Sequence, residues 1–189
     1  KVRKRKDMKK ISIIGGTGYT GLELIRILVN HPKVEISHIA SREVKSPVSE
    51  HHPSLGKLTS LVFEGQDLKK CADSDLVFLC TPHGTSMALA PSLLKSGTKV
   101  IDFSGDFRFA DAKLYESTYN IKHSCPELLK EAIYGLPEIN REKIKKAKLV
   151  ANPGCYPTSA ILPLYPIRDL IEYAFIDSKS GVSGAGAEP

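Results

Sequence analysis

A short β-branched run that leads directly into a glycine-rich turn is the feature that most constrains this chain. Residues 10–14 (KISII) precede GGTGYTG at residues 15–21, and an amphipathic helical pattern follows over residues 22–28. Strand, glycine turn and helix in this order form the context in which a glycine pattern binds a dinucleotide. Glycines let the backbone turn sharply and approach a pyrophosphate, whose charge then faces the helix N-terminus. We therefore predict cofactor contacts from Gly15, Gly16, Thr17, Gly18, Tyr19, Thr20 and Gly21.

The rest of the chain alternates strand and helix patterns. Strands are expected at residues 35–40, 76–80, 99–102 and 149–151, with helices at 86–95 and 140–146. This alternation predicts an α/β fold, a Rossmann-like doubly wound and mostly parallel sheet. After Cys155 the pattern changes to a helix from residue 158 and a strand at 175–179, which we interpret as the start of an incomplete α+β second domain. We expect a basic, disordered tail at 1–8, a dinucleotide-binding Rossmann domain at 9–152, and the beginning of a catalytic or substrate domain at 153–189 whose remainder is absent.

The residues after the second expected strand bear on the choice of dinucleotide. That strand ends in Ser41 and Arg42, where an NAD-binding chain carries an acidic residue for the ribose 2′-hydroxyl. A hydroxyl and a guanidinium suit a 2′-phosphate instead. An ordinary polar loop is the alternative interpretation. We expect Ser41 and Arg42 to select NADP(H).

A second motif, NPGCYPT at residues 152–158, places Cys155 after a tight turn and at the start of a new apolar segment. If that segment is a helix, the free N–H groups at its N-terminus favour a thiolate, which is suited to attack an acyl carbon. The alternative is a small buried cysteine after a turn. The segments 15–21, 41–42, 81–84, 104–108 and 152–155 all follow expected strands, so we expect them to converge on one sheet edge, with Thr81 and Pro82 near the cofactor.

Composition excludes several other classes of protein. The first ten residues hold seven of the 27 Lys and Arg and one of the 21 Asp and Glu, so the remainder carries 20 of each and has no net charge. A basic tail on a neutral body does not indicate a nucleic-acid surface. No apolar run approaches the roughly 18 residues of a membrane span. The four cysteines lack a CxxC pair, which favours reduced thiols in an intracellular protein, and the six histidines show no metal-ligand spacing, so no metal site is expected.

Six motifs together closely resemble the N-acetyl-γ-glutamyl-phosphate reductases of the semialdehyde dehydrogenase superfamily. They are GGTGYTGLEL, TPHGTS, DFSGDFRF, YGLPEI, NPGCYPTS and KSGVSGAG, in this order over about residues 9–186. The resemblance implies an oxidoreductase of arginine biosynthesis that uses NADPH and a cysteine thioester to reduce an N-acylated γ-glutamyl phosphate. It also implies a homo-oligomer, a dimer or tetramer, and a cytoplasmic location, or a plastid or mitochondrial matrix location in a eukaryote.

The resemblance also assigns roles to individual residues. Cys155 matches the family's nucleophile, and Arg108 lies where the superfamily binds a phosphate or carboxylate, although a surface arginine in a loop is the alternative. Asn152 either donates a hydrogen bond to the acyl oxygen or phosphate, or only shapes its turn. The family's glycine segment on the nicotinamide side matches Ser183, Gly184 and Gly186.

Two departures from the family leave alternatives open. The family motif continues from GAG into an arginine, but Ala187 follows here, and no residue matches the family's catalytic histidine. His83 belongs to a different loop and is not assigned that role, so we expect these 189 residues alone to bind the cofactor with little or no turnover. An aspartate-semialdehyde dehydrogenase, an aminoadipyl-phosphate reductase and a Rossmann module that only binds nucleotide are the alternative interpretations.

Overall fold

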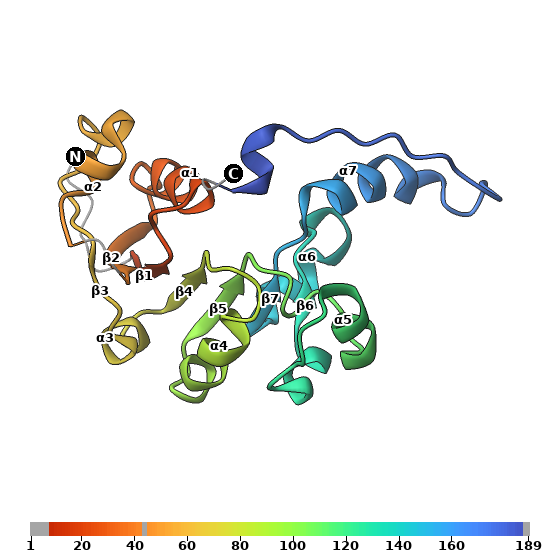
Figure 1. The fold of residues 1–189 in the computed structure, drawn as a ribbon, viewed down its shortest axis with the longest axis horizontal. Coiled ribbons are helices and arrows are strands. Elements are labelled where there is room, and N and C mark those ends of the chain that lie inside the picture. Colours follow the sequence, from red (N-terminus) through yellow and green to blue (C-terminus); the bar gives the residue numbers. More distant parts are fainter. Residues whose placement is uncertain (1–7, 43–44, 187–189) are drawn as a thin grey trace.

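Seven parallel strands form a single sheet in the order β3-β2-β1-β4-β5-β7-β6 (Figure 1). The structure is a computed structural model that describes residues 8–42 and 45–186, so nearly all of the predicted basic tail lies outside the described residues. The strands are β1 (Lys9–Ile14), β2 (Val34–Ser41), β3 (Glu64–Gly65), β4 (Leu76–Leu79), β5 (Lys99–Asp102), β6 (Ile133–Tyr134) and β7 (Leu149–Ala151). The five predicted strands up to residue 151 are therefore confirmed, and the two-residue strands β3 and β6 are additional.

Helices connect most of these strands. The α-helices are α1 (Tyr19–Leu28), α2 (Val48–His51), α3 (Leu68–Ala72), α4 (Ser86–Lys95), α5 (Ala112–Tyr119), α6 (Pro137–Lys146) and α7 (Cys155–Leu164). Shorter 3₁₀ turns are η2 (Pro53–Leu55), η3 (Pro126–Lys130), η4 (Tyr165–Ile167) and η5 (Val182–Ala185). Helix α6 begins three residues before the predicted start, with Pro137 at a favourable first position, but the non-helical φ of −116° and ψ of 19° at Asn140 put a kink at the predicted start itself.

Apolar residues cover the sheet on both faces. Ile11 and Ile13 of β1 belong to a cluster with Ile25 of α1, whereas Ile14 belongs to a second cluster with Leu93 of α4. Side chains alternate between the two faces of a strand, so these clusters lie on opposite sides of β1. A parallel sheet with helices on both faces is the predicted doubly wound α/β fold, which is confirmed.

The strand order reverses at β1. The chain leaves β1 for β2 and β3 on one side, and then crosses to β4 on the other side. In doubly wound sheets a ligand binds at such a reversal, outside the carboxyl ends of the strands. The turn after β1 and the turn after β4 are therefore the expected neighbours of a cofactor.

The chain beyond residue 152 has little buried surface. Helix α7 contains no buried residue, and a coil then turns back along α7 toward the side of the molecule that carries α1 (Figure 1). The predicted strand at 175–179 is wrong: the segment is a coil, because no described strand lies beside it to accept its backbone hydrogen bonds. This region carries most of the exposed large apolar side chains, namely Tyr156, Tyr165, Ile167, Leu170, Ile171, Tyr173, Phe175, Ile176 and Val182.

No helix among residues 8–42 and 45–186 combines the length and apolar character needed to cross a membrane.

Candidate active site

The glycine turn after β1 is fixed by contacts that only glycine permits. Gly15 has φ +86°, and a Cβ there would lie 2.2 Å from the carbonyl oxygen of Cys80 at the end of β4. A Cβ on Gly21 would lie 2.6 Å from Gly16 Cα, so the first turn of α1 packs directly on the glycine turn. The predicted strand–turn–helix unit is thus present, and its glycines bring β1, β4 and α1 together.

The N-terminus of α1 has the properties of an anion site. Its N-cap is Gly18, no side chain caps it, and its first turn has no acidic residue. A Cβ on Gly18 would meet no atom within 4 Å, so this side of the turn is open. Free N–H groups and the helix dipole favour a phosphate at such a position. The turn fits the pyrophosphate of a dinucleotide, while Tyr19 and Thr20 are exposed beside it.

Ser41 and Arg42 lie at the carboxyl end of β2, on the same edge of the sheet. Ser41 is buried and pairs with Gly65 of β3, whereas Arg42 is exposed. No acidic residue occupies either position, so the composition of this end remains suited to a 2′-phosphate.

Cys155 is the first residue of α7, and its thiol is exposed. A hydrogen bond from the Ser180 hydroxyl, which lies 3.5 Å from Sγ, lowers the pKa of the Cys155 thiol; the N–H groups of Tyr156 and Cys155 and the charge of Arg108 act in the same direction. The alternative of a small buried cysteine is therefore not what the structure has. A thiol at an uncapped helix start beside a guanidinium is a suitable nucleophile.

The environments of the other three cysteines raise the thiol pKa, whereas that of Cys155 lowers it. Burial raises the pKa of Cys71 and of Cys125 to about 11, and that of Cys80 to about 12. They are thiols at neutral pH and serve as small apolar side chains.

Arg108 is held by backbone carbonyl groups beside the cysteine turn. Its Nε donates to the Asn152 carbonyl at 2.9 Å and one terminal nitrogen donates to the Phe103 carbonyl at 2.9 Å. The other terminal nitrogen lies 3.1 Å from where a Cβ on Gly154 would stand. None of the ion pairs among residues 8–42 and 45–186 includes Arg108. Its charge therefore faces the start of α7 without a carboxylate partner among these residues.

The side-chain amide of Asn152 hydrogen-bonds within the cysteine turn rather than facing outward as a free donor for a substrate. Its side-chain amide donates to the Pro153 carbonyl at 3.1 Å, and its backbone N–H donates to the Asp102 carbonyl at 2.7 Å. Of the two roles considered for Asn152, these contacts favour the structural one.

The loops after β4 and β5 are tied together by a buried carboxylate. Asp106 accepts hydrogen bonds from the N–H groups of Gly84 (2.8 Å) and Met87 (2.9 Å) and from the Tyr115 hydroxyl (3.0 Å). His83 accepts the Gly105 N–H at Nδ1, 2.7 Å away, and partial burial together with the Arg108 charge lowers the pKa of His83 while Asp106 opposes this effect. Because Nδ1 accepts the Gly105 N–H, the ring proton lies on Nε2.

The remaining predicted cofactor residues lie on two separate segments. Thr81 follows β4 and its hydroxyl hydrogen-bonds that of Ser86 at 2.8 Å, whereas Pro82 is exposed. Ser183, Gly184 and Gly186 lie in or beside η5 and are exposed. Ser180, just before η5, makes the hydrogen bond that joins this segment to Cys155.

Several residues of the site escaped the sequence reasoning. Ser180 and Asp106 fall within recognised motifs, but nothing in a motif states which serine faces a thiol or which carboxylate is buried. His51 and His52 are two of the six histidines whose spacing predicts no metal site, and the sequence indicates no other role for them. Their Nε2 atoms lie 3.2 Å from the Thr17 oxygen and 2.9 Å from the Gly16 oxygen, on the glycine turn itself. Among the described residues, no group of three or more potential ligands could hold a metal ion.

Comparison with known proteins adds three findings. Residues 10–147 match the family model of the semialdehyde dehydrogenase NAD-binding domain. The chain is 53% identical over 184 residues to an N-acetyl-gamma-glutamyl-phosphate reductase of Herminiimonas arsenicoxydans, which covers 95% of this chain and 53% of that protein. It is 50% identical over 187 residues to a reductase of the same name from Methanococcus maripaludis, with 95% and 53% coverage. The chain thus spans about half the length of the curated relatives it matches.

A solved structure shares the fold. The aspartate semialdehyde dehydrogenase with NADP from Candida albicans superposes with a TM-score of 0.61 at 16% sequence identity, covering 86% of this chain and 47% of that one.

Proposed function

The chain belongs to the semialdehyde dehydrogenase family, and on that premise we propose that it carries the cofactor site and the nucleophile of an NADPH-dependent acyl-phosphate reductase. Its substrate is N-acetyl-γ-glutamyl phosphate and its product N-acetylglutamate semialdehyde, as the names of its relatives suggest for a step of arginine biosynthesis. The observation that carries the proposal is the exposed Cys155 at the start of α7, with Arg108 beside it, on the same sheet edge as the glycine turn.

The residues of the sheet edge suit NADP(H). The glycine turn and the N-terminus of α1 would hold the pyrophosphate, Ser41 and Arg42 the 2′-phosphate, and the segment with Ser183 and Gly184 the nicotinamide side. Support comes from the missing Cβ atoms at the turn, the uncapped helix start, and the NADP bound by the Candida albicans neighbour. When bound, NADPH supplies the hydride that reduces the acyl group.

Cys155 performs the covalent step. Its thiolate attacks the acyl carbon, a carbon–sulfur bond forms, and the carbon–oxygen bond to phosphate breaks, so that inorganic phosphate leaves with the electron pair of that bond. After the thioester carbon has gained a hydride, the carbon–sulfur bond breaks and returns its electrons to sulfur, which releases the aldehyde. Ser180 and the helix N–H groups stabilise the thiolate at both ends of this cycle.

Arg108 supplies a fixed positive charge to this step. Two backbone carbonyls hold its guanidinium in place, so little side-chain entropy is lost when it binds an anion. A planar guanidinium suits either the departing phosphate or the substrate carboxylate. A module that only binds nucleotide would have no use for this cation or for an exposed low-pKa thiol next to it.

A substitution at the nucleophile tests the proposal. In the full-length protein, Cys155→Ser should abolish phosphate-dependent oxidation of N-acetylglutamate semialdehyde with NADP, followed as absorbance of NADPH, because a serine hydroxyl is not ionised near neutral pH. NADPH affinity, measured by titration calorimetry, should stay within about threefold, because the cysteine adds little to cofactor contact.

The matched control is Ser159→Ala on the same exposed face of α7, which should keep its activity. Activity retained in Cys155→Ser would refute the nucleophile. NADPH affinity lost together with activity would instead make Cys155 structural.

Location and assembly follow from the same family membership. A cytoplasmic enzyme is proposed because the relatives are bacterial and archaeal proteins named for a biosynthetic reaction. A homo-oligomer, a dimer or tetramer, is proposed because the resemblance to the N-acetyl-γ-glutamyl-phosphate reductases implies one.

A further inference from the structure

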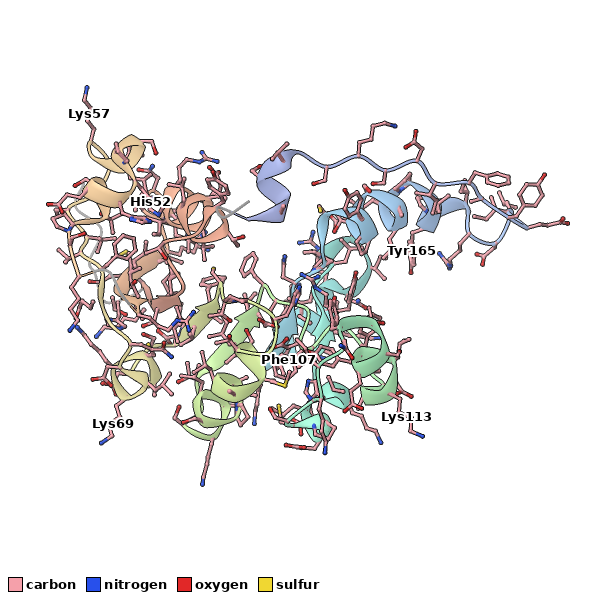
Figure 2. The ribbon with its side chains drawn as sticks, in the orientation of Figure 1. His52, Lys57, Lys69, Phe107, Lys113 and Tyr165 are labelled. Atoms are coloured by element: carbon pink, nitrogen blue, oxygen red, sulfur yellow. The ribbon has the colours of Figure 1, made fainter. Side chains whose placement is uncertain are left out.

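Two adjacent histidines, His51 and His52, follow β2 in the chain and hydrogen-bond to carbonyl groups of the glycine turn. His52 stands between α2 and η2 and is only 7% exposed, and its Nε2 lies 2.9 Å from the carbonyl oxygen of Gly16. The exposed His51 places its Nε2 3.2 Å from the carbonyl oxygen of Thr17. A carbonyl oxygen can only accept, so both Nε2 atoms carry the proton and donate. Figure 2 shows His52 inside the part of the molecule that holds α1 and α2.

These two oxygens have no other backbone partner among the described residues. Residues 16 and 17 lie between β1 and α1, where neither the sheet nor the helix supplies an N–H group to their carbonyls. Gly16 is buried, and a buried carbonyl without a donor is unfavourable, so the peptide that contains the Gly16 carbonyl would rotate toward solvent if the His52 imidazole were absent. The histidines therefore determine the direction in which the two carbonyls point.

The direction of a carbonyl also fixes the direction of the next N–H group. In a trans peptide the C=O of one residue and the N–H of the following residue point to opposite sides, and no cis peptide occurs in the described chain. The hydrogen bond to the Gly16 oxygen thus directs the Thr17 N–H away from His52. The bond to the Thr17 oxygen does the same for the Gly18 N–H, at the residue whose open side meets no atom within 4 Å.

We propose that His52, assisted by His51, is a positioning residue that aims the N–H groups of Thr17 and Gly18 at the pyrophosphate of the dinucleotide. Successive N–H groups that point into one concavity, next to a helix N-terminus, form an anion site. His52 does not touch the ligand; it acts through the peptide groups. The inference rests on the proposed binding of NADPH at this turn.

Packing keeps the two rings in place. His51, His52 and Phe63 form a cluster of edge-to-face contacts with centroid distances of 4.8, 5.8 and 5.9 Å. Phe63 is 1% exposed, and its ring lies 3.0 Å from where a Cβ on Gly16 would stand. His51, His52 and Phe63 therefore form a packed support for the turn.

The test compares two polar substitutions at His52 by calorimetric titration of NADPH. The amide nitrogen of Gln occupies nearly the position of Nε2, whereas that of Asn is one carbon too short. His52→Gln should bind NADPH within about threefold of the unaltered protein, and His52→Asn about tenfold or more weakly. His31→Leu is the control, because His31 is an exposed histidine in the turn before β2 and should leave the affinity unchanged.

A second ligand separates positioning from general damage. Adenosine 2′-monophosphate has no pyrophosphate, so its affinity should be the same in all three variants. The inference is overturned if His52→Asn binds NADPH as well as His52→Gln does, or if both ligands lose affinity together. Absence of NADPH binding to the unaltered protein would instead refute the proposed function, so the two failures are distinguishable.

Discussion

Alanine substitutions at three glycines distinguish the loss of unfolding free energy caused by backbone strain from the loss caused by a steric clash. Gly97, after α4, has φ +90° and a Cβ there would meet nothing within 4 Å, so Gly97→Ala adds strain alone. Gly15 has a similar φ of +86°, but its Cβ would stand 2.2 Å from the Cys80 carbonyl oxygen, so Gly15→Ala adds strain and a clash. Gly18 has φ −78° and open space, so Gly18→Ala adds neither.

The expected losses of unfolding free energy follow from these geometries. Placing an L-residue in the left-handed region costs about 1–2 kcal/mol, which is the expectation for Gly97→Ala. Forcing backbone atoms apart in a packed region adds about 1–3 kcal/mol, so Gly15→Ala should lose about 3 kcal/mol in total. Gly18→Ala should change stability by no more than about 0.5 kcal/mol.

Urea unfolding followed by circular dichroism measures all three variants, provided that the m-value stays constant. A loss for Gly15→Ala equal to that for Gly97→Ala would refute the reasoning, since the contact with β4 would then relax at no cost. A loss of the same size in Gly18→Ala would show that glycine itself, rather than its geometry, sets the effect.

Further predictions concern the thiol, a buried carboxyl and the cofactor. Cys155 should be alkylated by iodoacetamide faster than Cys71, Cys80 and Cys125, as mass spectrometry after brief labelling can measure. Ser180→Ala should move the midpoint of the pH–rate profile of this alkylation upward, whereas Ser178→Ala should not. Burial raises the pKa of Asp102 to about 6, so the folded state binds the carboxyl proton of Asp102 more tightly than the unfolded chain does. This difference contributes to the free energy of unfolding in full below about pH 4, and the contribution is lost as the pH rises through 6. Asn does not titrate, so Asp102→Asn does not undergo that loss. The unfolding free energy of Asp102→Asn minus that of the unaltered protein should therefore rise by about 2–3 kcal/mol between pH 4 and 8 in urea titrations, and a difference that stays constant would contradict this. Arg42→Ala should bring the affinities for NADPH and NADH close together, and a retained preference for NADPH would mean that other residues read the 2′-phosphate.

The sheet and its first helix were predictable because short-range patterns determine them. A β-branched run marked β1, and the GGTGYTG turn marked the beginning of α1. The strands β3 and β6 were missed because two residues carry no periodicity, and they pair only through the strand next to them. Helix α5 was missed as well; its Asp111 cap is readable in the sequence, but only Tyr115 within the helix is buried.

The candidate site was predictable only as far as individual motifs allow. A helix was expected from residue 158, and α7 begins three residues earlier, so that Cys155 stands at its first position, as the conditional argument from the Asn-Pro-Gly turn requires. The contact from Ser180 depends on a coil that returns over 25 residues, and the histidine contacts depend on how the segment between β2 and β3 folds back. Such tertiary contacts have no local signature in the residues that make them.

The carboxylate of Asp106 has a consequence for how the site opens. Because Asp106 accepts the N–H groups of Gly84 and Met87 and the Tyr115 hydroxyl, and His123 donates to its carbonyl, the loops after β4 and β5 share one set of bonds. The loop after β4 cannot separate from the loop after β5 unless the bonds from Gly84 and Met87 to Asp106 break. The two loops thus form one cooperative unfolding unit, whose amide hydrogens exchange with solvent in a single event rather than loop by loop.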